Sequence, residues 1–143
     1  MRLPRLVLAE DHEPMALQLR ALLAPACDIV GTVEDGSALV AAADALEPDV
    51  IVSDISMPGL SGLAAAQIIL ARHPATRFVF VTMRDERAVV RAALKCGGLA
   101  YVLKCDAGDE LVAAVRAAIA GEEYISTNAR AALGSSGVKR TPR

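Results

Sequence analysis

The chain has 143 residues, enough for one domain with a substantial core and too few for two. Its composition is 54% hydrophobic and 22% charged, which excludes a disordered or collagen-like chain. The net charge of −2 disfavours unaided binding of nucleic acid by this segment, because phosphate backbones select strongly basic faces.

Two further features of the composition concern location. No apolar run approaches the roughly 18 residues of a membrane helix, and the first residues lack the apolar region of a signal peptide, so we expect no membrane association. The cysteines Cys27, Cys96 and Cys105 are odd in number and lack paired spacing. They predict free thiols in a reducing, cytoplasmic setting.

Short apolar runs alternate with longer helical segments along the chain. The runs are too continuous for strands with one solvent-exposed face, and they predict strands buried on both faces. The predicted strands are Arg5–Ala9, Ile29–Val33, Val50–Ser53, Phe78–Thr82 and Ala100–Leu103. Each is followed by a segment with the apolar spacing of an amphipathic helix.

Five such βα units predict an α/β fold, a doubly wound parallel sheet with helices on both faces. In the strand orders common for such sheets, the functional residues lie just beyond the carboxyl ends of the strands. Residues 1–125 are predicted to form this domain. Residues 126–143 lack apolar periodicity and predict a flexible basic linker, in which Ala129–Leu133 could add a helical turn.

Charged and hydroxyl residues follow four of the predicted strands. Glu10 and Asp11 follow the first strand, and Asp54 follows the third. If these strands are neighbours, three carboxylates share one small cleft, and such an oxygen-rich cluster suits Mg²⁺. Thr82 and Lys104, at the ends of the fourth and fifth strands, would add a hydroxyl and a cation.

This set of groups matches the requirements of phosphoryl transfer. A phosphoryl group on Asp54 would meet a metal, a hydroxyl and an ammonium, and Asp54 is the central carboxylate. Each residue alone has an ordinary structural explanation, such as a turn former or a solvated charge. Their joint occurrence at successive strand ends favours a functional site.

The residues at this point resemble the receiver domain of two-component response regulators. The resemblance covers about Leu6 to Tyr124, and it is carried by Val-Leu-Ala-Glu-Asp-His from residue 7, Val-Ile-Val-Ser-Asp-Ile-Ser-Met-Pro-Gly-Leu-Ser-Gly from residue 50, Phe-Val-Phe-Val-Thr from residue 78 and Gly-Leu-Ala-Tyr-Val-Leu-Lys from residue 98. It implies the flavodoxin- and CheY-like strand order 2-1-3-4-5. It also implies a phosphorylation-dependent signalling switch rather than an enzyme, with at most self-catalysed phosphotransfer and autodephosphorylation.

The resemblance assigns roles to individual residues. Asp54 would accept a phosphoryl group from a sensor histidine kinase, and Thr82 and Lys104 would contact the phosphoryl oxygens. Tyr101 would be the aromatic residue whose rotamer follows Thr82 in the active state. Mg²⁺ would be held by Glu10, Asp11, Asp54 and the backbone carbonyl of Ser56.

The subgroup is indicated by Glu10–Glu13, Gly98–Lys104 and Gly121–Ser126, which resemble the NarL/FixJ group. Members of that group usually carry a LuxR-type helix-turn-helix domain, which begins with a sequence similar to Lys139–Arg143. We therefore expect a transcriptional output, with DNA bound only through a C-terminal domain absent from this chain and with possible homodimerisation on phosphorylation. A natural stand-alone receiver is the alternative.

Three positions depart from the family pattern. Cys105 replaces the proline that often follows the lysine. Met83 replaces the small residue that commonly follows the switch hydroxyl, and it is expected to narrow access to Asp54. Arg84, together with Ser56, is expected to tune the attack of water on the acyl phosphate.

Other classes of protein remain as alternatives. A haloacid-dehalogenase-like phosphohydrolase would need an Asp-x-Asp pair where this chain has Glu10-Asp11-His12. A flavodoxin-like nucleotide module would not place two carboxylates against an anion. A pseudo-receiver that acts without phosphorylation is opposed by the complete set of acids, hydroxyl and lysine, while Met83 and Cys105 leave it open.

Overall fold

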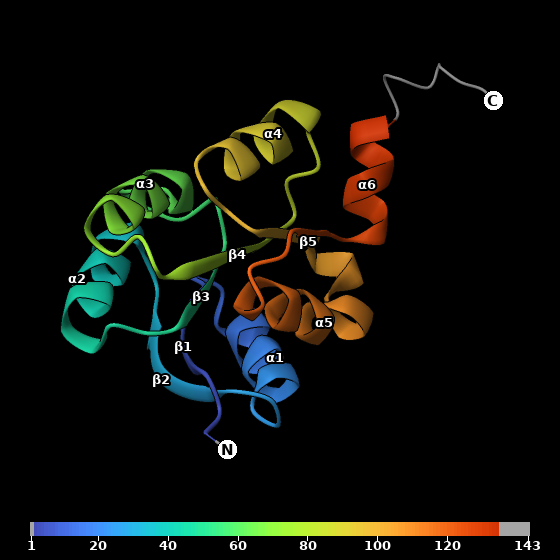
Figure 1. Ribbon diagram of the computed structural model, residues 1–143. Coiled ribbons are helices and arrows are strands. Elements are labelled where there is room, and N and C mark those ends of the chain that lie inside the picture. The colour runs from blue at the N-terminus through green and yellow to red at the C-terminus, as the bar shows by residue number, and fades with distance from the viewer. Residues whose placement is uncertain (1, 135–143) are drawn as a thin grey trace.

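The computed structural model describes residues 2–134 as one parallel sheet between two layers of helices (Figure 1). The strands are β1 (Arg5–Ala9), β2 (Asp28–Val33), β3 (Val50–Ser53), β4 (Arg77–Thr82), β5 (Ala100–Leu103) and β6 (Tyr124–Ile125). The helices are α1 (Glu13–Leu23), α2 (Gly36–Leu46), α3 (Gly62–Arg72), α4 (Arg87–Lys95), α5 (Ala107–Ile119) and α6 (Thr127–Gly134), with a 3₁₀ turn, η1, at Lys104–Asp106.

The strand order is β2-β1-β3-β4-β5-β6, and every pair of neighbours is parallel. The predicted α/β class and the order 2-1-3-4-5 are therefore confirmed, with one short strand added beyond β5. The central strands β3 and β5 are buried at all their residues, as the continuous apolar runs predicted. Within residues 2–134 no helix is long and apolar enough to cross a bilayer.

The two faces of the sheet have separate cores. Helices α1 and α5 cover one face, where Leu19 and Leu111 pack with Leu8 and Val81. Helices α2, α3 and α4 cover the other face and enclose the adjacent rings of Phe78 and Phe80. Both layers leave the carboxyl edge of the sheet free for polar groups, because the helices begin beyond the loops that follow the strands.

Local capping fixes the loops at this edge. The side chains of Asp35 and Ser61 accept the amides of Ala38 and Ala64, and so cap α2 and α3. At Gly62 an added Cβ would lie 2.0 Å from the carbonyl oxygen of Asp54, so only glycine fits there. The start of α3 therefore packs directly on the end of β3 and supports the loop that carries Asp54.

The C-terminal region differs from the prediction. The helical turn expected over Ala129–Leu133 is present as part of a longer helix, α6, whereas the expectation of a flexible linker from residue 126 does not hold for residues 126–134. Strand β6 pairs with β5, Ser126 is fully buried, and α6 packs against α4 and β5 with Ala129 in the core. The expectations for residues 135–143, including the beginning of a DNA-binding domain, lie outside the described residues.

Candidate functional site

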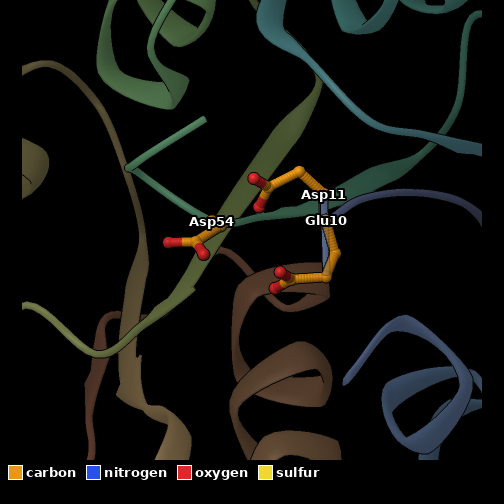
Figure 2. Close-up of side chains that lie close together, drawn as sticks. All are labelled: Glu10, Asp11 and Asp54. Atoms are coloured by element: carbon orange, nitrogen blue, oxygen red, sulfur yellow. The ribbon is translucent and has the colours of Figure 1, made fainter. Parts of the chain in front are cut away.

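Three carboxylates meet at the carboxyl edge because β1 and β3 are neighbours in register. Ala9 pairs with Ser53, so the next residues of the two strands, Glu10 and Asp54, leave the sheet side by side. Figure 2 shows Glu10, Asp11 and Asp54 turned toward one another, and their oxygens include a set within 4.8 Å of one another. Glu10 and Asp54 are 1% and 5% exposed, whereas Asp11 is open to solvent.

Lys104 supplies the cation of this cluster. Its Nζ lies 2.8 Å from Oδ2 of Asp54 and 2.9 Å from Oε1 of Glu10. Burial by itself would lower the pKa of Lys104, but the hydrogen bonds and charges of the two carboxylates outweigh burial and raise it above its ordinary value of 10.5. The ammonium therefore stays charged and holds both carboxylates.

The backbone after β3 orients Asp54. Its Oδ1 accepts the amide of Ile55 at 2.6 Å and the amide of Ser56 at 3.3 Å. Oδ2 is the oxygen that faces Lys104. The carboxylate is thus held from both sides, by backbone amides at Oδ1 and by the Lys104 ammonium at Oδ2.

The loop after β4 carries the hydroxyl and contacts Tyr101. Oγ1 of Thr82, which is 1% exposed, accepts the amide of Arg84 at 3.2 Å. The phenol of Tyr101, on β5, donates to the carbonyl oxygen of Arg84 at 2.5 Å. Burial, and then the nearby charge of Glu86, raises the pKa of Tyr101 well above its ordinary value, so the phenol stays protonated and able to donate.

The side chain of Arg84 spans the edge of the site. It donates to Oγ of Ser56 at 3.2 Å and to both carboxylate oxygens of Glu86 at 3.0 and 3.1 Å. It lines an open groove of about 670 Å³, together with Asp11 and Ser56. The neighbouring Met83 is 78% exposed.

The acidic cluster has the properties of a site for a hard divalent cation. Oε1 of Glu10 is buried and faces the Lys104 ammonium at 2.9 Å, without a second donor among the described residues. Asp11 is exposed and adds a third carboxylate to the cluster of Glu10 and Asp54. Buried oxygen with unused acceptor capacity, next to a solvent-exposed carboxylate, fits an ion that keeps several waters and takes few protein ligands.

The structure thus brings together Glu10, Asp11, Asp54, Thr82, Lys104, Ser56 and Arg84, the residues predicted at the strand ends and in their loops. Tyr101 reaches this group only through the backbone of Arg84. Cys105 is exposed and lies in η1, which continues directly into α5. The roles of these residues in phosphorylation remain predictions at this point.

Sequence reasoning missed Glu86, which fixes Arg84 from the same loop, and the buried acid Asp106. Glu86 lies two residues after Arg84, and that spacing is too common to indicate a functional pair. Asp106 lies two residues after Lys104, just before the predicted helix that begins near residue 107, where an aspartate is common and indicates no distant partner.

Comparison with known proteins agrees with this geometry. Residues 6–116 match the family model described as the response regulator receiver domain. The chain is 32% identical over 124 residues to the response regulator GacA of Pseudomonas viridiflava, covering 85% of this chain and 58% of that protein. It is 34% identical over 125 residues to the uncharacterized transcriptional regulatory protein YxjL of Bacillus subtilis, covering 86% of this chain and 57% of the relative.

Solved structures give the same result. A two-component response regulator of the LuxR family from Aurantimonas superposes with a TM-score of 0.89 at 27% identity, over 95% of this chain and 99% of that one. The signal receiver domain of the response regulator NarL from Mycobacterium tuberculosis gives 0.81 at 29% identity, over 85% and 100% of the two chains.

The chain belongs to the response regulator receiver family, and its relatives include regulators of the NarL and LuxR type. A receiver is a regulatory domain of a two-component system. The chain spans 58% of the length of GacA and 57% of the length of YxjL.

The pairing of Lys104 predicts a pH-dependent loss of stability. Replacing Lys104 with Met leaves Glu10 and Asp54 without their cation and should lower the free energy of unfolding by roughly 3 kcal/mol in metal-free buffer at pH 7. Because the folded-state pKa is raised, the stabilisation is complete below the ordinary value of 10.5 and is lost as the pH rises through the folded-state pKa.

Urea denaturation from pH 7 to 11.5 checks this prediction. The gap between the wild type and Lys104→Met should narrow above about pH 10.5. The control Lys95→Met, in the exposed last turn of α4, should stay within about 0.5 kcal/mol of the wild type. A gap that does not change with pH would contradict the assignment.

Proposed function

We propose that this receiver accepts a phosphoryl group on Asp54 and uses it as a signalling switch. One observation carries the proposal: the carboxylate of Asp54 is held 2.8 Å from the Lys104 ammonium, in a cluster with two further acids and beside the Thr82 loop. These are the charges that phosphoryl transfer needs, since its catalysis is mostly positioning and charge stabilisation.

The transfer itself needs little from the protein. An Asp54 carboxylate oxygen forms the bond to phosphorus, while the bond from phosphorus to the imidazole nitrogen of a kinase phosphohistidine breaks. The imidazole leaves with the electron pair and takes a proton from solvent. Lys104 and the hydroxyl of Thr82 stabilise the phosphoryl oxygens, and the amides of Ile55 and Ser56 keep Asp54 in place.

A divalent cation completes the charge balance, and Mg²⁺ is the one we propose. Glu10, Asp11, Asp54 and the backbone carbonyl of Ser56 would hold it. When bound, it would neutralise charge on the transferring group and offset the repulsion among the carboxylates. The buried Oε1 of Glu10, which has no donor but the Lys104 ammonium among the described residues, supports this part of the proposal.

Switching follows from the added charge at Asp54. A phosphoryl group brings about −1.5 to −2 charge units and new acceptor oxygens next to Lys104 and Thr82. Thr82 and Tyr101 both hold the backbone of Arg84, so a Thr82 hydroxyl drawn toward the phosphoryl group displaces the loop on which Tyr101 depends. The β4–α4 loop and β5 would then favour a second arrangement.

The names of two relatives support a transcriptional output. GacA is called a response regulator and YxjL a transcriptional regulatory protein. We therefore propose a sensor histidine kinase as the phosphoryl donor, and a transcriptional output through a DNA-binding domain of the LuxR type outside this chain. Phosphorylation would favour a homodimer, and the cytoplasm is the proposed location.

Two exposed residues are proposed to set the rates. Met83 would narrow the approach to Asp54, and Arg84, bonded to Ser56, would control the water that hydrolyses the acyl phosphate. Slow autodephosphorylation of this kind is the one self-catalysed reaction, beside phosphotransfer, that we propose for the domain.

Replacing Asp54 with Asn should abolish incorporation of acid-labile phosphate from acetyl phosphate and Mg²⁺, because the amide is no nucleophile. The control Asp28→Asn, at the start of β2 and exposed, should label like the wild type. Phosphate incorporation measured by radiolabel decides the matter. Labelling of Asp54→Asn would identify another acceptor, and an unlabelled wild type would favour the pseudo-receiver.

Trimming Met83 to Ala should speed phosphorylation by acetyl phosphate about two- to tenfold, since tenfold corresponds to only about 1.4 kcal/mol of barrier. Stopped-flow labelling rates check the change. Leu3→Ala, a truncation of another exposed apolar side chain near the opposite edge of the sheet, should leave the rate unchanged. Equal rates for Met83→Ala and the wild type would contradict a gating role.

A further inference from the structure

A buried carboxylate outside the phosphorylation site holds the start of helix α6. Asp106, in η1, is 6% exposed. Its Oδ2 accepts the hydroxyl of Ser126 at 2.6 Å and the amide of Asn128 at 2.9 Å, and its Oδ1 accepts the side-chain amide of Asn128 at 2.6 Å. Asp106 therefore binds Ser126 and Asn128, which lie between β6 and the first turn of α6, some 20 residues later in the chain.

A second carboxylate reinforces this contact. Glu110, in the first turn of α5, accepts the amide of Thr127 at 3.1 and 3.2 Å and the phenol of Tyr124 at 2.9 Å. The first amides of a helix have no partner within the helix and carry partial positive charge. Here two of them, on Thr127 and Asn128, are satisfied by acids from η1 and α5 rather than by α6 itself.

The same segment is bonded to the strand that carries the switch residues. Ser126 donates its amide to the carbonyl oxygen of Tyr101 at 2.9 Å, and its hydroxyl oxygen accepts the amide of Leu103 at 3.1 Å. Leu103 directly precedes Lys104. Ser126 is thus bonded both to the backbone of β5 and to Asp106, which follows β5 in the chain.

The electrostatics of Asp106 favour its charged form. Burial would raise the pKa of Asp106, but the hydrogen bonds from Ser126 and Asn128 outweigh burial and lower it below its ordinary value. An ionised, buried carboxylate with this many donors is geometrically restrained, and removing its charge leaves those donors without an equivalent acceptor.

We propose that Asp106 is a latch that fixes α6 to the Lys104 end of β5 and makes the docking of α6 depend on the state of the phosphorylation site. Lys104 and Asp106 are two residues apart in one 3₁₀ turn. When Lys104 moves from the Asp54 carboxylate to follow a bound phosphoryl group, the turn moves with it and withdraws Asp106 from the amides of α6.

Helix α6 is placed to report such a change. It lies beside α4 and β5 (Figure 1), and Ala129 packs in the same core cluster as Tyr101 and Val90. A loosened α6 would uncover this side of α4 and β5. The coupling rests on the proposed phosphorylation of Asp54, whereas the latch itself does not.

Hydrogen exchange of the α6 amides, measured on the full chain by NMR, tests both parts. Exchange of residues 127–134 is compared with and without Mg²⁺ and beryllofluoride, an analogue of the phosphoryl group. The ¹⁹F signal of bound beryllofluoride reports independently whether the Asp54 site is occupied. In the wild type, the analogue should speed α6 exchange by about threefold or more.

Asp106→Asn should speed α6 exchange about tenfold or more without the analogue, and beryllofluoride should then add no further change. Ser126→Ala, a milder change in the same network, should give an intermediate rate. Asp109→Asn is the matched control and should behave like the wild type, because Asp109 is an aspartate only three residues after Asp106, in the first turn of α5, but is exposed.

Wild-type exchange rates in Asp106→Asn would overturn the latch. A wild type with bound ¹⁹F signal whose α6 exchange is unchanged or slower, or an Asp106→Asn variant that still responds to the analogue, would overturn the coupling. A missing ¹⁹F signal would contradict the proposed function and the coupling with it, while the exchange rates without the analogue would still decide the latch.

Discussion

The ion pairs of Lys104 with Glu10 and Asp54 are the interaction on which the rest of this receiver depends. Two nearly buried carboxylates on neighbouring strands repel each other, and one ammonium, about 2.9 Å from each, offsets that cost. Lys104 directly follows β5, and β4 lies between β5 and β3, so its side chain crosses the end of β4 to reach Asp54. A long, flexible cation is needed there, with the short side chain of Thr82 at the end of the crossed strand.

This constraint links the chemistry to the conformation. Any anionic group bound to Asp54 competes with the Asp54 and Glu10 carboxylates for the Lys104 ammonium. Two residues after Lys104 is Asp106, the acid that holds the start of α6. The loop after β4 is tied in the same way, because Thr82 and Tyr101 hold the backbone of Arg84. A local change of charge therefore reaches two surrounding segments through short, named contacts.

Most of the sheet could be predicted because burial on both faces leaves continuous apolar runs, as in Val50–Ser53. Strand β6 and most of helix α6, beyond the turn over Ala129–Leu133, could not be predicted. Tyr124–Ile125 is only two residues long, and α6 is held by Asp106 and Glu110 from more than 15 residues earlier rather than by its own apolar pattern. Among the site residues, those at strand ends follow from position, whereas the contacts of Arg84 with Ser56 and Glu86 depend on rotamers.

Chemical mapping of the modified residue tests the central claim most directly. The chain is phosphorylated with acetyl phosphate and Mg²⁺, reduced with sodium borohydride, which converts an aspartyl phosphate to homoserine, and digested for mass spectrometry. Our account predicts homoserine at position 54 and at no other position in the chain. Homoserine at a different aspartate, or a chain with no reduced residue despite bound phosphate, would contradict it.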